Sequence, residues 1–139
     1  MTSKRSVAMA AGAALAVSTA VIITGLTPAS AAETDCSTPD MTSTWTLASG
    51  DSHAEPNGTY FWSWDPGTFT ACLDGPDDAE FDFVMQRYTG QDWQTVATAT
   101  GSGADKSLSY TGEATVYRLV VTAVSGSGSY SVRLDRPGI

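Results

Sequence analysis

Short stretches in which apolar and polar residues alternate run through most of the chain from residue 42 onward, separated by Gly, Pro and Asp. Successive side chains of a strand point to opposite faces, so this period of two predicts strands with one buried face. The clearest stretch places Phe81, Phe83 and Met85 on one face. After residue 31 no window of ten residues combines helical periodicity with a cap, so we predict an all-β domain.

Eight such stretches follow one another about 8–12 residues apart, a spacing typical of an antiparallel β-sandwich or barrel. They span residues 42–47, 59–64, 68–73, 81–88, 93–99, 106–110, 116–124 and 129–134. The stretch 116–124 is the most apolar and is predicted to be a central strand. Residues 65–67 (Asp-Pro-Gly) are a strong turn signal, so we expect the two stretches beside them to form a hairpin. We expect residues 50–58 to be a polar loop.

The first residues have the pattern of a secretory signal peptide. A short basic start precedes an apolar run over residues 6–26, and Ala29-Ser30-Ala31 supplies a small-x-small cleavage site. A transmembrane anchor is the alternative, since about 20 apolar residues can span a bilayer. The run is rich in Ala, Ser and Thr and only weakly hydrophobic. We therefore expect removal of residues 1–31 and one secreted, extracellular domain over residues 32–139.

The predicted mature domain is strongly acidic. It keeps all 15 acidic residues but only five of the seven basic ones, which gives a net charge of −10. Nucleic-acid binding needs a basic surface. The same charge opposes binding to anionic membranes and anionic wall polymers. We expect no nucleic-acid partner and no membrane association after cleavage.

Cys36 and Cys72 are the only two cysteines. In an exported protein a lone pair is most simply a disulfide, here closing a loop of about 35 residues. Such a bond is worth roughly 3–4 kcal/mol in the chain-entropy model. A redox or nucleophilic cysteine is the alternative, but the chain has neither a C-x-x-C motif nor a base near either residue.

The residue types argue against an enzyme. A Ser-His-Asp triad needs a histidine, and the single one, His53, falls in the expected polar loop without a G-x-S-x-G motif. We expect it to be an ordinary exposed loop residue. A zinc site needs three or four Cys or His ligands. A carboxylate pair for glycoside hydrolysis is compatible with the composition, but a small sandwich with short turns leaves little room for a deep cleft.

Five carboxylates lie within nine residues and are a candidate calcium site. Ca²⁺ takes six to eight oxygen ligands, and extracellular calcium can occupy a weak site. The spacing does not match an EF-hand, and solvation of the charges is the simpler interpretation. The expected ligands are Asp74, Asp77, Asp78 and Glu80, ahead of Asp82, which alternates with Phe81 and Phe83. We expect no other cofactor.

Aromatic residues are the candidate ligand-binding groups. In a strand Tyr60, Trp62 and Trp64 share one face, where they could stack on sugar rings, or that face could belong to the core. Trp93 follows a Gly-Gln-Asp turn: either the hairpin end projects its ring into solvent, or the ring belongs to the core.

Residues 72–134 resemble the bacterial pre-peptidase C-terminal domain. That family has a D-F-D-L-Y-L strand, a W-N-G-x-x-W turn and a terminal G-x-G-x-Y strand; here the corresponding residues are 81–88, 90–97 and 125–132. The resemblance implies a jelly-roll β-sandwich and an accessory role in secretion, stability or substrate attachment, sometimes with calcium near the amino-terminal strands. The turn at residues 89–93 departs from the usual Asn and Ser, and we expect a free-standing copy with no preceding catalytic domain.

We therefore expect a secreted, non-catalytic binding or accessory module that attaches to an extracellular polysaccharide or protein. The alternative is a small secreted protein that inhibits or escorts an exported protease through a protein interface.

Overall fold

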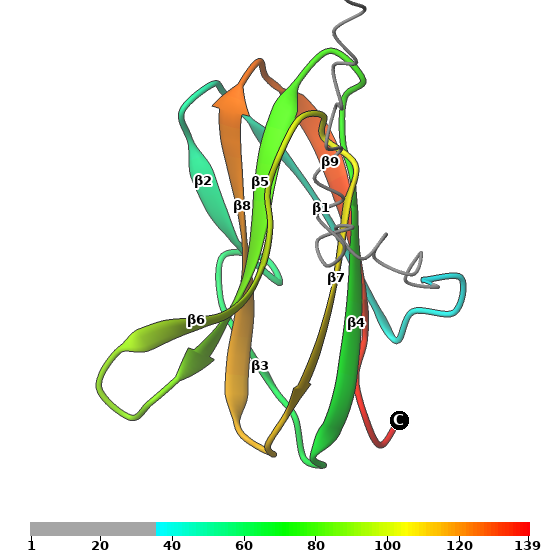
Figure 1. Ribbon diagram of the computed structural model, residues 1–139, viewed down its shortest axis with the longest axis vertical. Coiled ribbons are helices and arrows are strands. Elements are labelled where there is room, and N and C mark those ends of the chain that lie inside the picture. Colours follow the sequence, from blue (N-terminus) through cyan, green and yellow to red (C-terminus); the bar gives the residue numbers. More distant parts are fainter. Residues whose placement is uncertain (1–35) are drawn as a thin grey trace, which may run out of the picture.

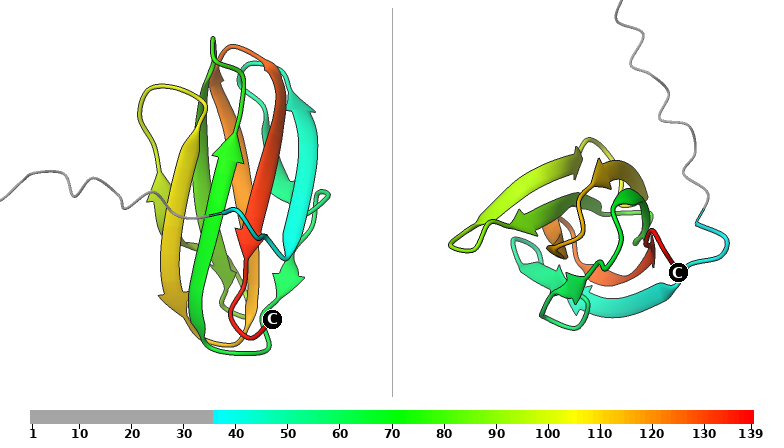
Figure 2. Two further views of the ribbon diagram at one scale, coloured as in Figure 1. Left: turned by 90° about the vertical axis from the view of Figure 1, so that its right-hand side faces the viewer. Right: turned by 90° about the horizontal axis from the view of Figure 1, so that it is seen from below.

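Two antiparallel β-sheets pack face to face in the computed structural model, which describes residues 36–139 (Figures 1 and 2). The strands are β1 Met41–Leu47, β2 Ser52–Glu55, β3 Phe61–Trp62, β4 Gly67–Asp74, β5 Glu80–Tyr88, β6 Trp93–Ala99, β7 Lys106–Gly112, β8 Val116–Ser125 and β9 Gly128–Asp135. None of the described residues forms a helix long and apolar enough to cross a membrane. The predicted signal peptide, residues 1–31, lies outside the described part of the chain.

The predicted all-β sandwich is confirmed, with nine strands where eight were expected. One sheet has four strands in the order β1-β9-β4-β7. The other has five, in the order β2-β8-β5-β6, with β3 also paired to β8. The apolar stretch predicted to be central is β8, which lies between β2 and β5. Most connections cross from one sheet to the other, so the core forms between strands that are distant in the chain.

The inner faces of both sheets form the core. Phe81, Phe83 and Met85 of β5 are fully buried on the face that the alternation predicted. On the four-stranded sheet, Phe69 and Leu73 of β4 face them as part of one apolar cluster. The outward residues of the same strands stay partly exposed, which is the pattern of two half-buried sheets.

The expected hairpin across residues 65–67 is wrong. Phe61 of β3 pairs with Tyr117 of β8 in the five-stranded sheet, whereas β4 pairs with β7 and β9 in the other. The turn therefore carries the chain between sheets. Turn residues favour a reversal of direction, but the partner of each strand depends on which face must be buried, and Phe61 is buried against Tyr117 with ring centroids 6.1 Å apart.

The expected polar loop at residues 50–58 contains a strand, and this expectation is also wrong. β2 pairs with β8, with Ser52 opposite Thr122 and Glu55 opposite Leu119. His53 is therefore a strand residue that is partly buried, and not an exposed loop histidine. Its ring lies parallel to that of Trp45, with centroids 4.2 Å apart and planes 3° apart.

A buried carboxylate connects the two sheets. Glu55 is completely buried on β2, and it accepts hydrogen bonds from the Tyr130 hydroxyl at 2.6 Å and from the Ser43 hydroxyl. The backbone N–H of Asn57 donates to the same carboxylate at 2.9 Å. Ser43 and Tyr130 belong to β1 and β9 of the four-stranded sheet. We call Glu55, Ser43 and Tyr130 the Glu55 clamp.

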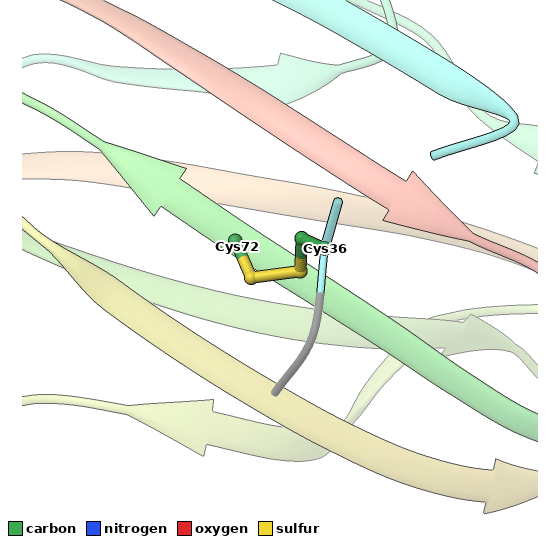
Figure 3. The surroundings of a disulfide bond; sticks show 2 residues. All are labelled: Cys36 and Cys72. Atoms are coloured by element: carbon green, nitrogen blue, oxygen red, sulfur yellow. A yellow bond between two sulfur atoms is a disulfide. The ribbon is translucent and has the colours of Figure 1, made fainter. Parts of the chain in front are cut away.

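The predicted disulfide is confirmed. Cys36 and Cys72 are bonded, with their Cα atoms 6.1 Å apart (Figure 3). Cys72 alternates with the buried residues Ala71 and Leu73 of β4, so its side chain lies on the outer face of the four-stranded sheet. The bond ties the beginning of the described chain to a strand that pairs on both sides.

Candidate ligand-binding site

Residues 60–64 alternate between the core and the surface. Phe61 and Ser63 are buried, whereas the exposed fractions of Tyr60, Trp62 and Trp64 are 49%, 50% and 78%. The predicted shared face is confirmed, and it faces solvent, so the interpretation of Trp62 and Trp64 as core residues is wrong. The two indole rings stack on each other, with centroids 5.7 Å apart and planes 14° apart.

Trp93 occupies an intermediate position. It begins β6, opposite Tyr88, and its ring is half-buried, which lies between the exposed and the core position that the sequence left open. The Tyr88 ring lies 5.2 Å away and the Tyr60 ring 6.3 Å away, centroid to centroid. The Arg118 guanidinium lies over the indole, 4.3 Å from its centroid. These contacts turn the indole back onto the sheet.

The rings line an open pocket of about 570 Å³ on the outer face of the five-stranded sheet. Its walls come from the loop before β3, from β3 and β8, and from the end of the β5–β6 hairpin that extends beside them (Figure 1). We call it the aromatic pocket; it is lined by Gly58, Thr59, Tyr60, Trp62, Tyr88, Trp93, Val116 and Arg118. Three of the four aromatic residues proposed from the sequence line this pocket: Tyr60, Trp62 and Trp93. The fourth, Trp64, does not line it but stacks on the Trp62 ring.

Arg118 is the functional candidate that sequence patterns missed. It lies between the buried residues Tyr117 and Leu119 of β8, so its side chain points to the outer face. Its Nε donates to the Gln86 side-chain oxygen at 2.7 Å. Burial lowers the pKa of Arg118 from its ordinary value, yet an arginine remains a cation at neutral pH. Alternation in residues 116–124 indicates its outward direction, but only the sheet register brings it to Trp93.

The acidic residues are spread along a loop and two strand ends. Asp74 ends β4, Asp77 and Asp78 lie in the turn, and Glu80 begins β5. Within residues 36–139, no group of three or more His, Cys, Asp or Glu side chains is placed to hold a metal ion. Calcium binding by Asp74, Asp77, Asp78 and Glu80 stays a prediction.

Comparisons with known proteins bear on the fold. The chain matches no protein-family model. It is similar to the pre-peptidase C-terminal domain of a collagenase from Bacillus anthracis, with a TM-score of 0.56 and 14% identity, covering 68% of this chain and 88% of that one. It is also similar to the Yersinia pseudotuberculosis-derived mitogen, with a TM-score of 0.53 and 17% identity, covering 73% of this chain and 89% of that one. The resemblance to the pre-peptidase C-terminal domain is thereby confirmed as a likeness of fold.

Proposed function

We propose that residues 32–139 form a secreted, non-catalytic module that attaches to an extracellular polysaccharide through the aromatic pocket. The observation that carries this proposal is the exposure of three neighbouring large rings, Tyr60, Trp62 and Trp64. Large aromatic side chains gain most by burial, so a contiguous exposed group of them marks a surface that a partner covers.

The shape of this surface favours a sugar. The faces of a pyranose ring carry C–H groups that pack on flat aromatic rings, and the exposed indole of Trp64, stacked on Trp62, offers such a ring. The aromatic pocket adds walls of the same kind beside Trp62, together with a few polar groups, among them the hydroxyl of Thr59 and the guanidinium of Arg118. Small-molecule sites typically combine apolar walls with a few polar groups that orient the ligand.

Two further features support a module that is exported and does no chemistry. The residues lining the aromatic pocket include no carboxylate and no histidine, the side chains that most often act as general acid or base. The Cys36–Cys72 bond suits an oxidising compartment, as does the signal-peptide pattern.

A protein partner is the second candidate. Trp, Tyr and Arg are the residues that protein interfaces favour at their centres, and all three types meet in the aromatic pocket. The structural neighbour named above is a domain of a collagenase, so collagen and exported proteases are the protein partners to test.

Retention of the mature domain on insoluble polymers distinguishes a polysaccharide ligand from a protein partner. Chitin, cellulose, bacterial cell wall and collagen would each be incubated with the wild type, with Trp62→Ala and with the control Trp45→Ala. Trp45 is a good control because it is 49% exposed on β1 but does not line the aromatic pocket. We expect retention on a polysaccharide that Trp62→Ala loses and Trp45→Ala keeps. Retention on collagen alone, or co-purification with a protease and no polysaccharide binding, would refute the sugar-binding proposal.

A further inference from the structure

The charge inside the aromatic pocket is opposite to that of the domain. Residues 32–139 carry fifteen acidic side chains against five basic ones. Among the residues that line the pocket, Arg118 is the only charged one. The pocket is therefore a locally cationic, aromatic site on a strongly anionic molecule.

Arg118 also lacks a carboxylate partner of the kind that Arg87 and Arg136 have. Arg87 forms an ion pair with Glu113 at 3.6 Å, and Arg136 with Asp40 at 2.5 Å. Between residues 36 and 139, no carboxylate forms an ion pair with Arg118, whose contacts are the neutral amide of Gln86 and the face of Trp93. Its pKa is lowered by burial, with no acidic group to offset that cost.

The two contacts also determine which part of the guanidinium a ligand can reach. Trp93 covers one face of the group, and the Nε hydrogen bond to Gln86 holds its plane. Within residues 36–139 no acceptor bonds to its Nη groups, so these donors are left for a ligand. A planar guanidinium edge matches a carboxylate with two parallel hydrogen bonds.

We propose that the aromatic pocket selects a sugar that carries a carboxylate, as uronic acids do, with its ring packed on the aromatic wall and its carboxylate on the Arg118 guanidinium. This inference rests on the proposed function and names the class of sugar. The net charge of −10 repels long polyanions. The ligand is therefore an isolated or terminal acidic sugar on a largely neutral chain, and not a polyuronate.

A matched pair of small ligands tests the selection. Methyl β-D-glucuronide and methyl β-D-glucoside differ only in a carboxylate and a hydroxymethyl group. Binding of each to residues 32–139 would be followed by the indole N–H signals in NMR titrations. We expect about tenfold tighter binding of the glucuronide, since a charge-assisted pair is stronger than a neutral one, and a smaller difference in 1 M NaCl.

Variants of Arg118 test whether this residue causes the preference for the glucuronide over the glucoside. Arg118→Gln should abolish the preference, so that the two glycosides bind with equal affinity, and Arg118→Lys, which keeps the charge but loses the planar edge, should retain part of the preference. Arg133→Gln is the matched control, because Arg133 is partly exposed on β9 of the other sheet and its loss changes the net charge equally.

Three outcomes would overturn the acid selection: equal affinity for the two glycosides, no binding of the glucuronide, or an undiminished preference in a folded Arg118→Gln variant. If the domain is still retained on a polysaccharide in those cases, the proposed function stands without the acid selection. Absence of retention on every polysaccharide tested would overturn both proposals.

Discussion

The Glu55 clamp and the aromatic pocket both place polar groups among large apolar side chains, but they satisfy those groups differently. In the clamp, the Glu55 carboxylate has three protein donors and no exposure to solvent. In the pocket, the Arg118 guanidinium has one neutral acceptor on its Nε, and the neighbouring Tyr60 and Trp62 are half-exposed.

The difference separates structural from ligand-binding polar residues. A buried group with all its partners inside the fold stabilises that fold, and its removal leaves the partners unsatisfied. A group with donors directed outward contributes little to stability and is available to a ligand. Substitutions in the Glu55 clamp should therefore lower mainly the stability, whereas substitutions in the aromatic pocket should weaken mainly the binding.

The largest effect is expected from Glu55→Ala. It leaves the hydroxyls of Ser43 and Tyr130 buried without an acceptor and opens a cavity between the sheets. We expect a loss of about 4 kcal/mol in the free energy of unfolding, since each unsatisfied buried group costs about 1–3 kcal/mol and the cavity adds to this. Urea denaturation measures it. A loss under about 1 kcal/mol would show that the clamp is not structural.

Removal of the disulfide should cause the second largest loss in the free energy of unfolding. The Cys36→Ser and Cys72→Ser double variant frees a loop with a sequence separation of 36 residues. We expect a loss of roughly 3 kcal/mol and a melting temperature lower by more than about 10 °C. Binding to a polysaccharide below the new melting temperature should persist, because the bond lies on the outer face of the opposite sheet. Loss of binding by the folded variant would contradict the separation of the disulfide from the aromatic pocket.

The Glu55 clamp should also make the domain less stable at alkaline pH. Burial raises the pKa of Tyr130, and the hydrogen bond to Glu55 and the charge of Glu55 raise it further. Tyr130 therefore stabilises the fold fully below its ordinary pKa of about 10, and that contribution is lost as the pH rises above it, by up to about 1.4 kcal/mol per pH unit.

Unfolding measured between pH 8 and pH 11 tests this loss of stability. Burial also raises the pKa of Tyr117, so part of the alkaline loss should remain in a Tyr130→Phe variant. We expect that variant to be less stable at pH 8 but to lose stability less steeply than the wild type. Equal slopes would contradict the role assigned to Tyr130.

The smallest effect on stability is expected in the aromatic pocket. Trp62 is half-exposed, so Trp62→Ala should lower the free energy of unfolding by less than about 1 kcal/mol. Trp93→Ala should cost more, about 1–2 kcal/mol, because the ring is half-buried and carries the Arg118 contact. Thermal melts of both variants check the order. A larger loss for Trp62→Ala than for Trp93→Ala would contradict the account.

The alternation of apolar and polar residues predicted which side chains share a face of a strand. Alternation placed Phe81, Phe83 and Met85 in the core and gave Tyr60 and Trp62 a common face. Whether that face was buried depended on the second sheet. β3 runs along β8 at the margin of the sheet, and the outer side of Trp62 remains uncovered.

The residues that were missed depend on pairing between distant strands. β2 is only four residues long, Ser-His-Ala-Glu, and has no strong β-former, so its pairing with β8 is what makes it a strand. Glu55 meets Tyr130 across 75 residues of sequence, and Arg118 meets Trp93 only because β5 lies between β6 and β8. No spacing within one segment contains that information.

The four tryptophans allow a direct test of whether the aromatic pocket binds the ligand. Trp62, Trp64 and Trp93 lie in or beside the aromatic pocket, whereas Trp45 stacks on His53 and does not line the pocket. A titration with a soluble oligosaccharide of the retained polymer would follow the four indole N–H signals. We expect the signals of Trp62, Trp64 and Trp93 to move with one dissociation constant while that of Trp45 stays. Movement of Trp45 as large as that of Trp62, or no movement of any signal, would contradict this expectation.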